Sequence, residues 1–95
     1  MATGPISVVR LQIRGRVQGV GYRWAMVQAA RRLGVTGWVR NRLDDSVEAV
    51  VAGPAESVER MVAWARQGPA SAAVAAVDVV EDEGQFGDFI QRPTA

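Results

Sequence analysis

Arg23 stands at the start of a predicted helix, directly after a glycine-rich stretch, where a fixed positive charge is unfavourable. The stretch GRVQGVGYRW covers residues 15–24 and contains three glycines within seven residues. The N-terminus of a helix already carries roughly half a positive charge, so a cation there costs about 0.3–1 kcal/mol. A phosphate bound to the loop and helix amides would reverse this, because each charge-assisted hydrogen bond from a guanidinium is worth about 1.5–3 kcal/mol. A tight strand-to-helix turn with an exposed arginine is the alternative that the spacing leaves open.

The inventory of reactive groups excludes several kinds of catalytic and metal site. The 95 residues contain no cysteine and no histidine, and all 11 basic residues are arginine. Cysteine and lysine nucleophiles, a Ser-His pair and imidazole zinc sites are therefore excluded. The glycine stretch also lacks the Gly-Lys-Ser/Thr ending of a P-loop and the third glycine of a dinucleotide fingerprint. Catalysis would have to use arginine, carboxylates, hydroxyls, amides and the main chain.

Charge is distributed unevenly along the chain. Residues 1–42 hold eight arginines and no acid, whereas residues 43–95 hold three arginines and all ten acids, a split of +8 against −7. This asymmetry favours an anion-facing region in the first part of the chain. The alternative is that the two parts interleave in the fold and neutralise each other. For Arg31 and Arg32 we favour a structural role, because positive charge in the last turn of a helix suits the dipole.

The apolar residues show the periods of strands and helices. Gly34 follows the first predicted helix as a C′ residue, and Gly68-Pro69 follows the second. The predicted helices cover residues 22–33 and the segment between Pro54 and Gly68. The predicted strands cover residues 6–13, 35–41, 46–52 and 73–80, with a short further strand at 89–92.

This order of elements predicts an α+β fold of the ferredoxin-like type, a βαββαβ sandwich whose antiparallel sheet carries two helices on one face. The first helix is a crossover, so the first two strands should run parallel with the third strand between them. Their C-terminal ends then lie at one edge, about 9–10 Å apart. Arg23 follows the first of these ends and Asn41 lies at the second, so a guanidinium could span much of the gap.

A single domain is predicted over residues 1–95, with frayed ends at 1–5 and 93–95. The longest apolar runs are too short to span a membrane, and the first residues do not resemble a secretory signal. The absence of cysteine fits a cytoplasmic location. A small domain with a charged surface predicts a monomer without a membrane partner.

Two motifs resemble the signatures of the acylphosphatase family. The first is IRGRVQGVGYR at residues 13–23, and the second is GWVRNRLDDSVEAVVAG at residues 37–53. The sequence RQGP at residues 66–69 is similar to the family's ending of the second helix. Asp45 departs from the pattern, because the family usually has a glycine there in the hairpin turn. Aspartate tolerates positive φ, so we expect the turn to form.

The resemblance implies metal-independent hydrolysis of the carboxyl–phosphate bond of acyl phosphates, with no cofactor and with inorganic phosphate as product and inhibitor. It implies two catalytic residues, Arg23 to bind the phosphate and Asn41 to position the attacking water. Main-chain amides of the loop at residues 15–23 would hold the phosphate together with the guanidinium. The phosphate-binding residues would be Arg16, Val17, Gln18, Gly19, Val20, Gly21, Tyr22 and Arg23.

The chemistry of this bond agrees with the inventory of side chains. The leaving group is a carboxylate with a pKa of about 4, so it needs little help from a general acid. The transition state is loose, and charge stabilisation and positioning can supply most of the catalysis. Asn41 can accept one hydrogen bond from water and donate another, but it is too weak a base to deprotonate water. We infer that an oxygen of the substrate's phosphate takes that proton.

Several other side chains have both a functional and a structural interpretation. The resemblance suggests a supporting hydroxyl at Thr36, although an ordinary strand residue explains this position better. Trp24 and Trp38 could line a pocket for the phosphate, but packing in the core or half-exposed packing is the simpler role for both. Arg16 could steer anions to the loop or simply be solvated.

Asp44, Asp45 and Glu48 are the candidate carboxylates for a metal site. We predict no metal there, because aspartate is favoured by the geometry of a turn.

Two other functions are compatible with the predicted fold. RNA-recognition modules share this order of elements, but they stack bases on aromatic residues of the central strands. The segments 6–13 and 46–52 contain no aromatic residue, so no nucleic-acid partner is expected. A non-catalytic regulatory module would not need an arginine and an asparagine facing a phosphate-sized pocket.

Overall fold

The computed structural model describes residues 5–95, and residues 1–4 of the predicted frayed N-terminus lie outside this range. The predicted order of elements is confirmed. The elements are β1 (Ile6–Arg16), α1 (Tyr22–Leu33), β2 (Thr36–Asn41), β3 (Val47–Pro54), α2 (Ala55–Gln67), β4 (Ala73–Glu81) and β5 (Phe89–Gln91).

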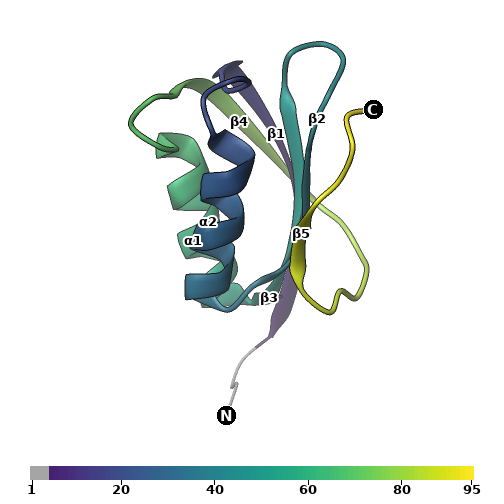
Figure 1. Cartoon of the computed structure of the whole chain (residues 1–95). Helices are drawn as coiled ribbons and strands as arrows, with labels where there is room; N and C mark the ends of the chain where they lie inside the picture. The colour runs from purple at the N-terminus through teal and green to yellow at the C-terminus, as the bar shows by residue number, and fades with distance from the viewer. Residues whose placement is uncertain (1–4) are drawn as a thin grey trace.

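The strands form one sheet in the order β4-β1-β3-β2-β5. β3 pairs antiparallel with both β1 and β2, so it lies between them as predicted and they run parallel to each other. β1 also pairs antiparallel with β4, and the short β5 adds a parallel strand beside β2. Both helices cover the same face of the sheet and leave the other face open (Figure 1). The topology therefore brings the C-terminal ends of β1 and β2 to one end of the molecule.

β1 is longer than the sequence predicts, and the predicted loop is correspondingly shorter. The strand continues through Arg16, with a register shift between Arg14 and Gly15 in its pairing with β4. At Gly15 the backbone has φ 125°, and a Cβ would lie 2.3 Å from the carbonyl oxygen of Ala73. Only glycine fits this close approach, so the β-bulge is built around it. Arg16 consequently lies at the end of a strand and not in the loop.

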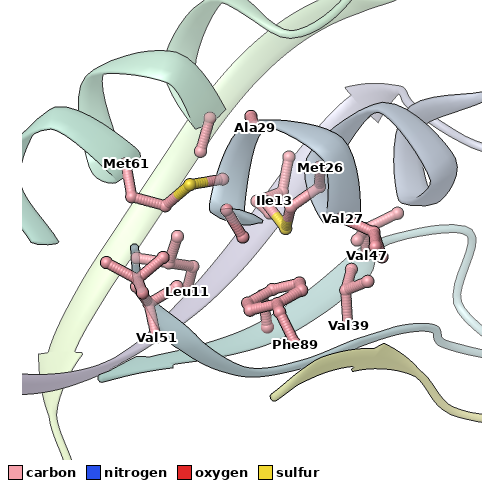
Figure 2. Packing of buried hydrophobic residues seen from close by; sticks show 14 of the residues in the cluster. Leu11, Ile13, Met26, Val27, Ala29, Val39, Val47, Val51, Met61 and Phe89 are labelled. Carbon is pink, nitrogen blue, oxygen red and sulfur yellow. The ribbon is translucent and has the colours of Figure 1, made fainter. Parts of the chain in front are cut away.

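The core fills the space between the helices and the sheet. The alternation in β1 buries Leu11 and Ile13, and the helical stripe of α1 buries Met26, all with no exposed surface. Figure 2 shows the α1 side chains packed over those of β1, with Phe89 of β5 beside Val39 of β2. The buried Phe89 ring fixes the position of β5, which has only three residues to pair.

The chain after β5 continues beside β2. The amide of Arg92 donates to the carbonyl of Val39 at 2.8 Å, and the amide of Ala95 donates to the carbonyl of Asn41 at 3.2 Å. The final residues therefore run toward the same end of β2 that carries Asn41.

Candidate active site

The glycine loop and the β2–β3 hairpin turn lie at the same end of the molecule (Figure 1). The loop turns sharply into α1 because Gly19 and Gly21 adopt φ values of 72° and 78°. A Cβ at either position would meet no heavy atom within 4 Å. Glycine is therefore favoured here by the left-handed backbone, and not by lack of space.

The main-chain amides of this loop point to an anion site. Across residues 18–24, no amide donates a hydrogen bond to a main-chain carbonyl of residues 5–95. The first turn of α1 contains no acidic residue, and Gly21 at its N-cap has no side chain to satisfy these donors. Successive free amides and the positive end of a helix together attract an anion.

The loop is tied to its neighbours on two sides. Gln18 donates from Nε2 to the carbonyl oxygens of Arg42 and Ser46, at 2.9 and 2.8 Å. On the other side the hydroxyl of Ser71 donates to the carbonyl of Val20 at 2.6 Å. The sequence predicts only a main-chain role for Gln18, so this side-chain brace is an unexpected feature. Its partners lie more than twenty residues away in sequence, so no local signal identifies them.

A hollow of about 130 Å³ opens between the loop, the start of α1 and the ends of β2 and β5. It is smaller than the roughly 300–1,000 Å³ of sites for drug-sized ligands, and it suits a small ligand such as a phosphate group. Arg23 and Asn41 both line it, so these two predicted residues meet at one site. The lining residues are Val17, Gly19, Gly21, Tyr22, Arg23, Trp24, Asn41 and Gln91.

Arg23 differs from most arginines of the first part of the chain in having no acidic partner. The basic and acidic parts of the chain do interleave in the fold, because five of the eight arginines in residues 1–42 form ion pairs with acids in residues 43–95. Arg23 forms no ion pair with any acid of residues 5–95 and is only partly exposed. Its charge is therefore available to a ligand in the hollow.

Asn41 has a buried carbonyl oxygen that no described residue satisfies. Oδ1 is the one buried side-chain polar atom in residues 5–95 without a hydrogen-bond partner. Leaving a buried acceptor unpaired costs about 1–3 kcal/mol, and such groups in proteins call for an explanation. Because the carboxamide can rotate and exchange its two ends, a ligand in the hollow can pair with either end. The neighbours Arg40 and Arg42 do not compete for that ligand, since both engage Glu48.

Tyr22 turns its side chain away from solvent. The ring is 1% exposed and packs against Trp64, and the hydroxyl donates to the carbonyl of Ala65 at 2.7 Å. Burial raises the pKa of the Tyr22 hydroxyl. The hydroxyl is thus neutral, and its hydrogen bond ties α1 to α2.

Some predicted candidates lie away from the hollow. Arg16, Gln18 and Val20 do not line it. Thr36 lies at the opposite end of β2 from Asn41, where its hydroxyl donates to the carbonyl of Ala52 at 3.4 Å. The Thr36 hydroxyl therefore does not support the site, and Thr36 is an ordinary strand residue.

The two tryptophans singled out in the sequence have different surroundings. Trp38 is 9% exposed on the open face of the sheet, and the guanidinium groups of Arg40 and Arg92 lie 4.9 and 4.7 Å from the centroid of its ring. Trp24 lines the hollow, and so does Gln91 of β5. Sequence reasoning missed Gln91, because the weak alternation of the last strand does not fix which way its side chains point.

The carboxylates considered for a metal take other roles. Within residues 5–95 no group of three or more histidine, cysteine or acidic residues could hold a metal ion. Asp44 accepts hydrogen bonds from the hydroxyl and the amide of Ser46, which lower the pKa of its carboxyl. Asp45 adopts φ 73° in the turn, as expected for a residue replacing glycine.

No helix in the described part of the chain is long and apolar enough to cross a membrane.

The chain is similar to proteins of one family over nearly its whole length. A family model described as Acylphosphatase matches residues 9–90. A protein named Acylphosphatase from Thiobacillus denitrificans is 54% identical over 87 residues, which cover 92% of this chain and 98% of that protein. Another from Albidiferax ferrireducens is 59% identical over 83 residues, covering 87% and 90%. The solved structure of an acylphosphatase from Coxiella burnetii matches with a TM-score of 0.88 at 33% identity, covering 92% of this chain and 93% of that one.

Proposed function

Because this chain belongs to the acylphosphatase family, a family of hydrolases, we propose that it hydrolyses the carboxyl–phosphate bond of acyl phosphates to a carboxylate and inorganic phosphate. The observation that carries the proposal is the shared hollow of Arg23 and Asn41 beside the loop amides. The geometry offers a cation and a carboxamide at one small site.

In this proposal the phosphate group lies among the loop amides and the guanidinium of Arg23. Amides without main-chain partners at residues 18–24 support this, together with the positive end of α1. A guanidinium donates two parallel hydrogen bonds to phosphate oxygens and keeps its charge at any working pH. Arg16 lies outside the hollow, so its contribution is limited to attracting anions from a distance.

Asn41 positions the attacking water. The position of Asn41 at the hollow supports this role, because rotation of the carboxamide can turn either its oxygen or its nitrogen toward a water there. The carboxamide fixes the direction of attack, in line with the bond to the leaving carboxylate. The water gives its proton to an oxygen of the phosphate group as the O–P bond forms and the acyl O–P bond breaks.

The leaving group makes a general acid unnecessary. A carboxylate with a pKa of about 4 departs without a proton at neutral pH. The guanidinium and the amides stabilise the charge on the phosphoryl oxygens in the loose transition state. Inorganic phosphate, the product, retains these interactions and should therefore inhibit the enzyme. The proposal also includes a cytoplasmic location and a monomeric state.

The RNA-binding alternative has weaker support. β1 and β3, the central strands of such a module, have no aromatic residue on the open face of the sheet. The one tryptophan on that face, Trp38, is covered by the guanidinium groups of two arginines and is 9% exposed.

The experiment that tests the function is hydrolysis of benzoyl phosphate by the purified protein in the presence of EDTA. We expect turnover that EDTA does not reduce and that inorganic phosphate inhibits. A phosphate monoester with an alkyl leaving group is the matched substrate control and should react far more slowly, because an alkoxide leaves poorly. Absence of turnover, or turnover lost with EDTA, would contradict the proposal.

A further inference from the structure

Trp24 is an exposed tryptophan that lines the hollow beside Arg23. It is 65% exposed, and the aromatic and cation–π pairs found in residues 5–95 do not include it. The other two tryptophans are packed, Trp38 on the open face of the sheet and Trp64 against the ring of Tyr22. An exposed tryptophan at the margin of a small polar hollow is a large apolar surface without a partner.

The helix explains why this ring faces the site. Side chains of a helix lean toward its N-terminus, so a residue in the first turn covers the chain that precedes the helix. Trp24 is the third residue of α1, and the preceding segment is the loop with Gly19 and Gly21. The buried side of α1 is elsewhere, at residues such as Met26 and Ala29. Trp24 therefore contributes to the hollow and not to the core.

The indole does not suit the phosphate end of a substrate. The face of an aromatic ring carries partial negative charge, so it offers nothing to an anion but packs well against apolar and aromatic groups. In-line transfer places the attacking water and the departing acyl oxygen on opposite sides of phosphorus. If Asn41 holds the water, the acyl group must leave past another part of the rim. Val17 and Tyr22 are each 1% exposed, so among the apolar lining residues only Trp24 offers a broad surface.

We propose that Trp24 is a specificity-determining residue that binds the acyl group, and that the enzyme prefers acyl phosphates with an aromatic or large apolar acyl group over acetyl phosphate. This inference rests on the proposed function. A benzoyl group can stack on the indole, whereas an acetyl group presents a single methyl to it. The contact forms equally in the bound substrate and in the transition state, so it should appear mainly in KM.

The test compares benzoyl phosphate and acetyl phosphate as substrates of the wild type and of three variants. Trp24→Ala should lower kcat/KM for benzoyl phosphate about fivefold, mainly through KM, which is the size expected for losing one aromatic contact. The same variant should change kcat/KM for acetyl phosphate by less than about twofold. Trp24→Phe should restore most of the preference, because it keeps an aromatic face. Val80→Ala removes another exposed apolar side chain, on β4 at the opposite edge of the sheet from β5, and should change neither substrate.

The outcomes separate this inference from the function on which it rests. If Trp24→Ala leaves both substrates unchanged, or lowers both by the same factor, Trp24 does not recognise the acyl group, although the enzyme remains an acylphosphatase. A selective loss in Val80→Ala would likewise overturn the assignment to Trp24. If the wild type hydrolyses neither substrate, the proposed function itself fails.

Discussion

Gln18 and Arg42 are joined by a hydrogen bond in which the side-chain amide of Gln18 donates to the main-chain carbonyl of Arg42 at 2.9 Å. The same amide donates to the carbonyl of Ser46 at 2.8 Å. Both acceptors flank the turn that follows Asn41. One side chain therefore links the loop that carries the free amides to the strand end that carries the carboxamide.

Removing this link should make the loop less rigid while leaving Arg23 and Asn41 in place. Gln18→Ala removes the two hydrogen bonds that tie the loop to the carbonyls of Arg42 and Ser46 and so frees the loop, and we expect kcat/KM about tenfold lower. The free energy of unfolding, measured with urea, should fall by about 1–2 kcal/mol. Gln28→Ala is the control, because Gln28 lies on α1 and its side chain makes no hydrogen bond to residues 5–95. Unchanged activity in the Gln18 variant would show that the loop holds its shape without this brace.

Tyr22→Phe should separate stability from catalysis. The variant loses the hydroxyl that donates to the carbonyl of Ala65, so the free energy of unfolding should fall by about 0.5–1.5 kcal/mol. The ring that packs against Trp64 remains, and kcat/KM should change by less than about twofold because the hydroxyl points away from the hollow. Urea denaturation and a kinetic assay of the same preparation measure both. A large loss of activity at wild-type stability would place the hydroxyl in the mechanism.

Asp45 carries backbone strain that a glycine would relieve. It is the one residue other than glycine in the described chain with positive φ, at 73°, and its side chain makes no hydrogen bond to residues 5–95. Asp45→Gly should raise the free energy of unfolding by about 0.5–1 kcal/mol, because the left-handed region costs an L-residue energy that glycine avoids. Asp45→Ala is the matched control and should lower stability. A less stable glycine variant would mean that the aspartate supports the turn.

Asp44 should make the stability of the hairpin sensitive to acid. Hydrogen bonds from Ser46 lower the pKa of the Asp44 carboxyl from its ordinary 3.8. A carboxyl with a lowered pKa in the folded state stabilises the fold at neutral pH, and this contribution is lost as the pH falls through the folded-state pKa. Wild type should therefore lose more stability than Asp44→Asn between about pH 6 and about pH 3, as measured by the urea midpoint. Equal losses in the two proteins would contradict this, and Glu59→Gln on α2 provides the control for removing an exposed acid.

The positions of Arg23 and Asn41 were predictable because general rules determine them. A right-handed crossover puts β3 between β1 and β2, so the C-terminal ends of β1 and β2 meet at one edge of the sheet. Asn41 is the last residue of β2, and Arg23 lies in the first turn of α1, whose start the preceding glycines indicate. The positive φ of Asp45 was also predictable, because a tight hairpin turn requires a positive φ at specific positions and Asp45 lies in the turn between β2 and β3.

Other features depend on partners that are distant in sequence. The extension of β1 through Arg16 comes from pairing with Ala73 of β4, across a bulge that hydrophobic periodicity does not reveal. The brace from Gln18 and the position of Gln91 in the hollow likewise require the assembled fold. The exposure of Trp24 was not predictable either, because helical spacing shows which face a residue occupies but not what lies beyond the helix end.

The measurement that tests the central claim most directly is kcat together with the inhibition constant of inorganic phosphate, in the Asn41→Ala and Arg23→Ala variants. Asn41→Ala should lower kcat by about two to three powers of ten while phosphate inhibits within about twofold of its wild-type constant. Arg23→Ala should lower the rate and also weaken inhibition by phosphate at least about tenfold, as expected for loss of a charge-assisted pair. Arg32→Ala removes an arginine in the last turn of the same helix and should change neither quantity. Full kcat in the Asn41 variant, or unaltered phosphate inhibition in the Arg23 variant, would contradict the assignment of water to one side chain and phosphate to the other.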